Sequence, residues 1–303
     1  MKTIEKTVKK QLEKIFGSNL KQHEFLRFHT TFRIGGPADY FITPRELKTF
    51  VQGLKFLHDN HVPVLVLGSG SNVLIKDTGI KKVVFNFKEL TDYIIIKDEK
   101  IFVGSGVSLI KLSNAVAEAG LSGLEWAAAI PGTVGGAIKG NAGAFGVNMS
   151  DVITGVDGIL GDGTTSMMHR DEISFSYRNS DLPEDFVILN SSLRLKKSSK
   201  RKVVKLMQKL NRQRLDTQPI GKRSAGSIFK NPKGKFAGEL IEKAGFKGYA
   251  FRGAKVSETH ANFIINESNA SATDVLNLID LISTSIFNTF GIKLELEIKI
   301  LGE

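Results

Sequence analysis

Two glycine-rich segments hold the residues whose types and spacing are best suited to binding an anion. The first is Gly68–Asn72 (GSGSN), and the second is Pro131–Gly146 (PGTVGGAIKGNAGAFG). Each can present successive backbone N–H groups beside a small hydroxyl side chain, as at Ser69, Ser71 and Thr133. Turns of this kind form concave anion sites without a dinucleotide-binding helix. We predict that both segments bind phosphate; the alternative is that they are tight turns connecting strands.

Positive charge is concentrated between Arg194 and Lys235. This segment holds fifteen Lys or Arg residues and one acid, Asp216, so its local net charge is +14, against +11 for all 303 residues. Such a segment indicates a polyanionic partner, for example the phosphates of a ligand. A solvated basic helix that aids solubility explains the charge equally well.

The better-known nucleotide and metal motifs are absent from the sequence. A G-x-G-x-x-G motif starting at Gly68 would need glycine at the position of Val73, and the acidic residue expected about 20 residues further on is missing. Gly221-Lys222 is followed by Arg223, so there is no Walker P-loop. The six histidines are scattered, and the chain has no cysteine for a disulfide or a thiolate ligand. We predict no metal site.

Helix and strand patterns alternate along the chain, which indicates an α+β fold. Apolar spacing predicts helices at 1–16, 46–60, 108–119, 199–214, 236–244 and 273–290. Strand patterns lie at 62–67, 82–86, 93–97, 100–104, 263–266 and 292–301. No apolar run is long enough for a membrane span or a signal peptide, and the absence of cysteine fits a reducing compartment, so we expect a soluble, cytoplasmic protein.

Seven stretches, taken in order, resemble the UDP-N-acetylenolpyruvoylglucosamine reductase family of peptidoglycan precursor synthesis. They are TTFRIGGPA (30–38), GSGSNVLI (68–75), IPGTVGGAIKGNAGAFG (130–146), SYRNS (176–180), SAGSIFKNP (224–232), HANFIIN (260–266) and LELEIKILG (294–302). The chain resembles the shorter, second subclass, because the run from Arg178 to Asn190 leaves no room for a long insertion. It departs from the common family pattern at Lys139-Gly140, Phe145 and Lys222-Arg223.

This resemblance implies a two-part FAD-binding domain of the vanillyl-alcohol-oxidase (PCMH) type and a C-terminal α+β substrate-binding domain. We expect parts at 1–90, 91–200 and 201–303, with the strand at 292–301 returning to the FAD-binding part. The implied cofactor is non-covalent FAD, and the implied co-substrate is NADPH. The implied substrate is the enolpyruvyl ether of a UDP-sugar, reduced to a lactyl ether by a monomer that binds neither nucleic acid nor membrane.

The family reaction implies three catalytic residues. Hydride addition to the vinyl carbon leaves negative charge conjugated into the substrate carboxylate, and Arg178 would hold that carboxylate with its planar fork. Ser227 matches the family's proton donor, although it could equally be a turn residue or a helix cap. Glu297 matches the catalytic glutamate by motif position alone, because strand alternation would place Glu295, Glu297 and Lys299 on one face.

The resemblance also implies residues that bind the cofactor and the substrate. FAD would contact Arg33, Gly68, Ser69, Gly70, Ser71, Asn72, Val73, Pro131, Gly132, Thr133, Gly136, Asn141, Ala142, Gly143 and Arg214. Substrate or nicotinamide would contact Tyr177, Lys230, Asn231 and His260. Lys196–Lys202 would be solvated, while phosphates would meet some of Arg212, Arg214, Lys222, Arg223 and Lys230.

Two other functions are compatible with parts of this sequence. One is a different FAD oxidoreductase of the same fold, such as an oxidase, which would lack the Arg, Ser and Glu residues in these motifs. The other is a nucleic-acid-binding protein that uses the basic segment. The second is weakened because the segment has one aromatic residue, Phe229, where single-strand binders need several stacking platforms.

Overall fold

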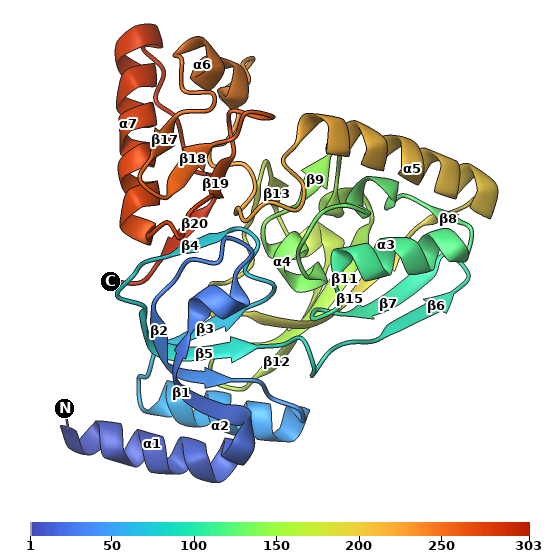
Figure 1. The fold of residues 1–303 in the computed structure, drawn as a ribbon. Coiled ribbons are helices and arrows are strands. Elements are labelled where there is room, and N and C mark those ends of the chain that lie inside the picture. Colours follow the sequence, from blue (N-terminus) through green and yellow to red (C-terminus); the bar gives the residue numbers. More distant parts are fainter. Residues whose placement is uncertain (1) are drawn as a thin grey trace. The chain divides into compact units, whose positions relative to one another are not determined.

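The computed structural model describes residues 2–303, and the chain folds into two compact units (Figure 1). Unit 1 comprises Met1–His23, Tyr40–Ser69 and Lys82–Asn211, and unit 2 comprises Glu24–Asp39, Gly70–Lys81 and Arg212–Glu303. Both units mix helices and strands, as the sequence predicts. The three-part division at residues 90 and 200 stays a prediction.

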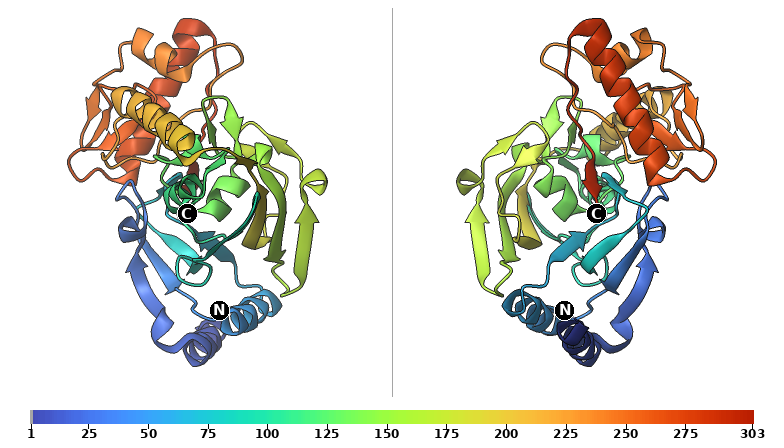
Figure 2. Two further views of the ribbon diagram at one scale, coloured as in Figure 1. Left: turned by 90° about the vertical axis from the view of Figure 1, so that its right-hand side faces the viewer. Right: turned by 90° about the vertical axis from the view of Figure 1, so that its left-hand side faces the viewer.

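A four-stranded sheet, most of whose residues lie in unit 1, and two helices form the first layer of that unit. The strands are β1 (Leu20–Phe25), β2 (Pro37–Ile42), β5 (Ile80–Asn86) and β3 (Val64–Leu67), in that order. The helices α1 (Lys2–Phe16) and α2 (Leu47–Asp59) lie beside each other (Figure 2). Edge-to-face contacts among Phe16, Phe50, Phe85 and Phe87 form part of the buried core between sheet and helices.

A five-stranded antiparallel sheet forms the second layer of unit 1. Its order is β12 (Thr165–His169), β11 (Ile153–Ile159), β15 (Val187–Arg194), β7 (Lys100–Gly104) and β6 (Ile94–Lys97). Helices α3 (Leu109–Glu118) and α4 (Val134–Lys139) share a core with its inner face, including Ile101, Val103 and Leu193. The Ser108 hydroxyl caps α3 and Gly120 follows it with φ +70°, which confirms the predicted helix.

Unit 2 packs helices α6 (Ala237–Lys243) and α7 (Ala272–Phe290) around a small sheet of β17 (Ala250–Phe251), β18 (Ala254–Val256) and β19 (Ile264–Asn266). A capping box of Ser271 and Asp274 starts α7, and Gly291 ends it in the left-handed conformation. Strand β20 (Lys299–Leu301) pairs in parallel with β4 (Val73–Ile75). The long helix α5 (Lys200–Thr217) begins in unit 1 and ends in unit 2.

The remaining elements are short. They are the strands β8 (Leu121–Ser122), β9 (Gly143–Ala144), β10 (Val147–Asn148), β13 (Phe175–Ser176), β14 (Asn179–Ser180) and β16 (Lys196–Lys197), and the 3-10 turns η1 (Gly17–Asn19), η2 (Leu26–His29), η3 (Glu125–Ala127), η4 (Met149–Asp151) and η5 (Arg170–Glu172). Among residues 2–303, no helix has both the length and the apolar character that crossing a bilayer requires.

The predicted closing strand at 292–301 is wrong in its extent. Regular strand is found at Lys299–Leu301, while Leu296 forms an isolated bridge with Phe229 and Glu297 lies in a bend. The backbone changes partner along this run, because Glu297 N–H donates to Ile228 O whereas Lys299 pairs with Val73. Because the partner changes, Glu295, Glu297 and Lys299 do not share one strand face as expected. The alternating sequence pattern does not reveal such a change of partner.

Candidate active site

In unit 1, the start of the first glycine-rich segment lies against the second segment. Gly68 follows β3, and its carbonyl accepts a hydrogen bond from Asn86 Nδ2 at 3.1 Å. A Cβ on Gly68 would come within 2.5 Å of Thr133 Oγ1, so a larger residue would push the two segments apart. Thr133 caps α4, where its hydroxyl accepts from the N–H of Gly136 at 3.3 Å. The two segments predicted to bind phosphate therefore meet at Gly68 and Thr133.

Three consecutive N–H groups in the first segment are available to a ligand. Within residues 2–303, the backbone N–H groups of Ser69, Gly70 and Ser71 donate to no protein acceptor. Gly70 has a φ of +61°, which turns the chain at this point. Adjacent unpaired N–H groups at such a turn suit a phosphate.

Several glycines of the second segment serve the packing of the protein itself. A Cβ on Gly135 would lie 2.9 Å from Ser105 Cβ, and one on Gly143 would overlap Asn148 Oδ1. Gly132 and Gly146 have φ values of +151° and +80°, which glycine adopts most easily. At these four positions the glycine excess is explained by close packing and turns, without a ligand.

The polar groups of Asn141 and Ala142 are engaged by the protein. The Asn141 side chain is buried, donates to Ser176 O at 2.9 Å and accepts from Ser150 N–H at 3.1 Å. Both backbone groups of Ala142 are also paired, with Ala137 O and with Met149 N–H. Cofactor contact by either residue stays a prediction, and both hold the glycine-rich segment in shape.

Arg178 lies at the tip of a small hairpin in unit 1. Strands β13 and β14 pair Phe175 with Ser180 and Ser176 with Asn179, which leaves Tyr177 and Arg178 as the turn. Arg178 has a φ of +59°, a conformation that costs a residue with a side chain about 1–3 kcal/mol. Its Nη2 donates to Gly143 O at 2.9 Å, and its guanidinium lies over the Tyr177 ring at 5.1 Å. The predicted carboxylate ligand thus contacts the second glycine-rich segment directly.

In unit 2, the backbone of a single residue, Ile228, joins the Ser227 segment to the Glu297 segment. Ile228 N–H donates to Asn262 O, and Ile228 O accepts from Glu297 N–H, each at 2.8 Å. Bridges between Ser227 and Phe263 and between Phe229 and Leu296 extend this ladder. Ser227 follows Gly226, whose φ is +81°, and is half-buried. Two predicted catalytic residues that lie 70 positions apart are therefore neighbours in the fold.

Asn262 holds this ladder together and was missed by the sequence analysis. Its side chain is 3% exposed, and its amide pairs with both backbone groups of Phe229, donating at 2.8 Å and accepting at 3.0 Å. A buried amide that satisfies two backbone groups is costly to replace, because each group left unpaired costs about 1–3 kcal/mol. Its place in the HANFIIN stretch was the available signal, but spacing does not reveal its partner.

The two glutamates of the LELE stretch lie in different environments. Glu295 is exposed, and its carboxylate lies 3.6 Å from Lys230 Nζ. Glu297 is half-buried beside the Ser227 segment. The structure therefore separates two residues that the sequence pattern left equivalent, because Glu295 is exposed whereas Glu297 is half-buried. The catalytic role of Glu297 stays a prediction.

The predicted substrate-binding residues of unit 2 surround the same ladder. Asn231 Oδ1 accepts from Ala237 N–H at 3.0 Å, so this side chain caps α6, whose N-cap residue gives no such bond. His260 packs edge-to-face on Phe263, and its Nδ1 accepts from Asn262 N–H at 3.2 Å. Burial lowers the pKa of His260, with Lys247 acting in the same direction. The ring is therefore neutral at neutral pH, with its proton on Nε2 as a donor.

The end of the first glycine-rich segment also contacts the ladder. Asn72 Nδ2 donates to Glu297 O at 3.2 Å, and Asn72 O accepts from Lys299 N–H at 3.0 Å. Val73 follows as the first residue of β4. The turn that carries Arg33 lies next to Gly70, whose carbonyl accepts from Thr31 N–H at 3.1 Å. Gly70, Asn72 and the Ser227–Glu297 pair thus belong to one part of unit 2.

Comparison with known proteins identifies the family. Residues 218–301 match the model of the UDP-N-acetylenolpyruvoylglucosamine reductase C-terminal domain, and residues 38–168 match an FAD binding domain. A reductase of that name from Anoxybacillus flavithermus is 43% identical over 285 residues, which cover 93% of this chain and 94% of the relative. The chain belongs to the UDP-N-acetylenolpyruvoylglucosamine reductase family.

Further relatives agree with this assignment. The reductase of Bacillus subtilis is 40% identical over 301 residues, covering 99% of each chain. The crystal structure of the Thermus caldophilus reductase superimposes with a TM-score of 0.82 at 34% identity, covering 93% of this chain and 100% of that one. The predicted α+β fold, with an FAD-binding domain of the expected type and a C-terminal reductase domain, is confirmed. The chain is an FAD-dependent oxidoreductase.

The observed residues fit FAD. The available N–H groups of Ser69, Gly70 and Ser71 can bind its phosphates, and Gly68 and Thr133 bring the second glycine-rich segment beside the first. This chain has no cysteine that could attach a flavin covalently.

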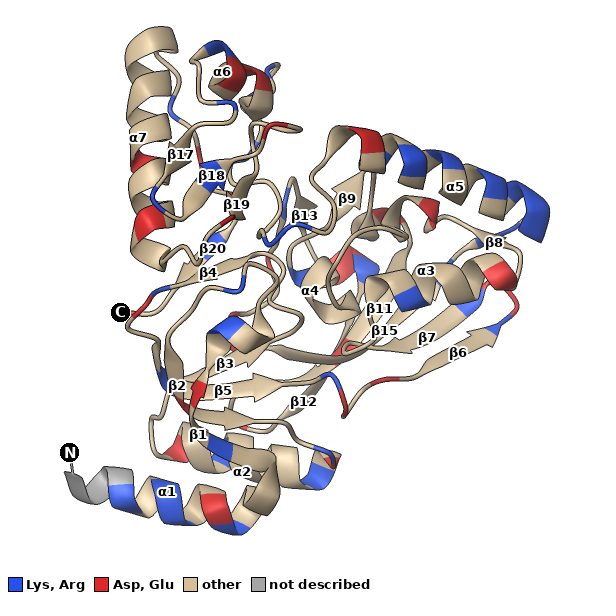
Figure 3. Cartoon of the chain, in the orientation of Figure 1, with Lys and Arg blue, Asp and Glu red and all other residues tan. Residues whose placement is uncertain are grey.

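The basic segment includes helix α5, along which Lys and Arg positions recur (Figure 3). Lys197 and Lys200 pair with Asp98 and Glu118, and Arg212 pairs with Asp216, all at exposed positions. Such pairs contribute little to stability. Lys196–Lys202 are exposed, as expected for solvated residues, whereas Arg214 is half-buried near the end of the helix. Contacts of the later cations with phosphates stay a prediction.

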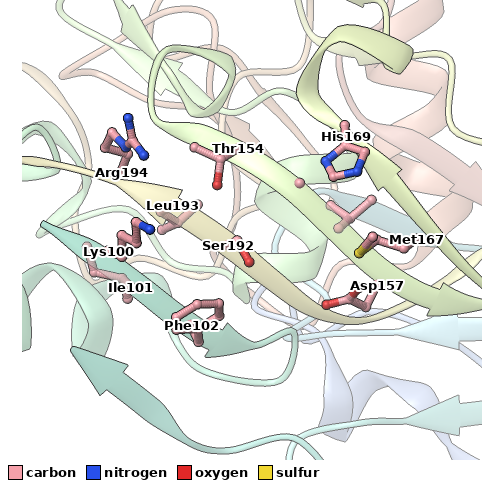
Figure 4. Close-up of a pocket in the computed structure, with 12 residues that line it drawn as sticks. Lys100, Ile101, Phe102, Thr154, Asp157, Met167, His169, Ser192, Leu193 and Arg194 are labelled. Atoms are coloured by element: carbon pink, nitrogen blue, oxygen red, sulfur yellow. The ribbon is translucent and has the colours of Figure 1, made fainter. Parts of the chain in front are cut away.

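A pocket on the five-stranded sheet contains none of the predicted site residues. It has a volume of about 270 Å³, and Phe102, Asp157, Met167, Ser192 and Arg194 are among the residues that line it (Figure 4). These side chains project from the face opposite to Ile101, Val103 and Leu193, which face the core. The pocket is therefore separate from the glycine-rich segments and from the Arg178 hairpin.

Proposed function

We propose that this chain reduces UDP-N-acetylglucosamine enolpyruvate to UDP-N-acetylmuramate, with NADPH as the source of electrons. Family membership supports the reductase reaction itself. The observation that supports the finer assignment is the hydrogen bond from Glu297 N–H to the carbonyl of Ile228, the residue that follows Ser227. FAD, held by the glycine-rich segments, would supply the hydride that the terminal vinyl carbon of the substrate receives, with NADPH as the source of the electrons.

Arg178 binds the substrate carboxylate in this proposal. Hydride arrival turns the terminal CH₂ into CH₃ and leaves an electron pair on the neighbouring carbon, delocalised into the carboxylate. A guanidinium stays charged at every physiological pH and offers parallel N–H donors to two oxygens. The strained turn and the bond to Gly143 O support the role, because they hold Arg178 in one orientation before substrate arrives.

Ser227 donates the proton that completes the reduction. Its Oγ–H gives a proton to the carbon that bears the ether oxygen, which forms the new C–H bond and transfers the negative charge to the serine oxygen. A proton from solvent then restores the serine hydroxyl. A serine suits this task, because the carbanion-like enolate is a strong base, while a free carboxylic acid would already be ionised at neutral pH. Glu297, on the next rung of the ladder, hydrogen-bonds the enolate or assists this proton transfer.

Binding and orientation fall to the other predicted residues. Tyr177, Lys230, Asn231 and His260 would contact the UDP-sugar or the nicotinamide, with neutral His260 as a donor through Nε2. Arg33, Arg214 and the glycine-rich segments would hold FAD, and some of Arg212, Lys222 and Arg223 would meet ligand phosphates. A monomeric state and a cytoplasmic location complete the proposal.

A product analysis tests the reaction. The FAD-loaded protein, incubated with NADPH and the enolpyruvyl UDP-sugar, should yield a UDP-sugar that is two hydrogen atoms heavier, detected by mass spectrometry. Heat-inactivated protein is the control. An unchanged substrate mass, with FAD bound and NADPH present, would show that this chain does not catalyse the reduction.

A further inference from the structure

The hairpin that carries Arg178, residues 175–180, cannot hold its position alone. Each of its strands has two residues, and it is not part of the five-stranded sheet. A hairpin of this size is at best marginally stable in water, and the left-handed conformation of Arg178 adds strain. The position of Arg178 must therefore depend on tethers to the rest of unit 1.

Three tethers run from the end of α4 and the residues after it. Ser180 Oγ donates to Lys139 O, Asn141 Nδ2 donates to Ser176 O, and Arg178 Nη2 donates to Gly143 O, each at 2.9 Å. Ser180 and Asn141 are buried, so these hydrogen bonds are protected from water. Both strands of the hairpin and its tip are thus tied to one short stretch of chain.

Lys139 adds a charged tether where the chain leaves the hairpin. Its Nζ donates to Leu182 O at 3.2 Å and to Pro183 O at 2.5 Å. Hydrogen bonds from an ammonium group are stronger than those between neutral groups. Because the backbone carbonyl of Lys139 also accepts from Ser180, this residue fixes the exit of the hairpin at three points.

Helix α4 connects these tethers to the first glycine-rich segment. Thr133 caps the start of the helix and lies against Gly68, and Lys139 is its last residue. Six residues of α-helix span about 9 Å, so the two ends form one short rigid unit. Any displacement of the Lys139 end moves Arg178 relative to Gly68 and Ser69.

We propose that Lys139 is a positioning residue for the reduction: its ammonium group fixes the Arg178 hairpin on α4 and so sets the place of the guanidinium relative to the segment that binds FAD phosphate. This inference rests on the proposed role of Arg178. Lys139 itself needs no contact with the reacting atoms. A misplacement of about 1 Å at a site of this kind can lower the rate about a hundredfold.

The test compares Lys139→Met, Lys139→Gln and Lys139→Arg in the FAD-loaded enzyme, with Lys205→Met as the control. Lys205 is exposed on α5 and has no side-chain bond within residues 2–303. Lys139→Met should lower kcat/KM for the enolpyruvyl substrate about tenfold to a hundredfold. Flavin reduction by NADPH should stay within about twofold of wild type. Lys139→Arg should recover most of the loss, and Lys139→Gln should fall between.

A second measurement does not need the cofactor. In flavin-free protein, amide hydrogen exchange at residues 175–183 should accelerate in Lys139→Met, while exchange in β11 and β15 should not change. Wild-type exchange at 175–183 together with wild-type kcat/KM would overturn the inference.

The Arg178→Ala variant separates the proposed role of Arg178 from the positioning role of Lys139. If Arg178→Ala also reduces the substrate at the normal rate, the proposed role of Arg178 has failed. If Arg178→Ala is slow but Lys139→Met is normal, the positioning role of Lys139 alone is refuted.

Discussion

Replacing Arg178 with alanine should slow the oxidation of reduced flavin by the enolpyruvyl substrate about 10²- to 10³-fold, the usual effect of removing one donor aimed at developing charge. Arg178→Lys should recover only part of this rate, because an ammonium keeps the charge but loses the planar fork. Anaerobic stopped-flow absorbance, starting from enzyme already reduced by NADPH, measures the step directly.

The control for this experiment is Arg201→Ala, which removes an equal charge from an exposed position on α5. It should leave the oxidation rate unchanged. Alanine also has a Cβ, so the Arg178→Ala variant keeps the strain of the left-handed conformation at this position. We therefore expect no gain in the stability of the hairpin. A wild-type rate of flavin oxidation in Arg178→Ala would show that the guanidinium does not bind the reacting carboxylate.

Replacing Ser227 with alanine should separate the two half-reactions. Reduction of the flavin by NADPH should proceed at the wild-type rate, while substrate reduction should slow about 10²- to 10⁴-fold, the range expected for loss of a proton donor. The variant should fold normally, because Ser227 joins the ladder with Phe263 through its backbone and not through its hydroxyl. Stopped-flow absorbance under anaerobic conditions measures each half-reaction in turn.

Ser224→Ala is the matched control for Ser227→Ala. Ser224 lies three residues earlier in the same stretch, and its carbonyl, not its hydroxyl, accepts from Thr31. This variant should keep both rates. Equal slowing of the two half-reactions in Ser227→Ala would mean that the residue supports the structure of the site instead of donating the proton.

Local signals in the sequence predicted individual elements well. The helix at Leu109–Glu118 was predicted from its spacing and from Gly120, and both its N-cap Ser108 and the left-handed Gly120 are found. These features depend on residues within one or two turns, which sequence reading can see. The family resemblance supplied what local signals could not, namely the flavin and the proposed roles of Arg178, Ser227 and Glu297.

The sequence patterns did not predict the contacts between segments that lie far apart in the chain. The run from Glu295 to Lys299 changes partner from Ile228 to Val73, so its alternation carries no information about faces. Asn262 pairs with Phe229 across 33 residues, and Lys139 reaches Pro183 across 44. Similarly, the sequence does not show that a side chain at Gly135 or Gly143 would collide with Ser105 or Asn148. In each case the structural role of the residue depends on a partner that is distant in the sequence and that only the fold brings close.

The most direct test of the account follows flavin absorbance in one anaerobic cuvette. The purified protein, as isolated or after addition of FAD, should show an oxidised flavin spectrum that NADPH bleaches and that the enolpyruvyl UDP-sugar then restores. This sequence of changes is the result that we predict. A protein that cannot be reconstituted with FAD, or a reduced flavin that stays bleached when the enolpyruvyl UDP-sugar is added, would contradict the central claim.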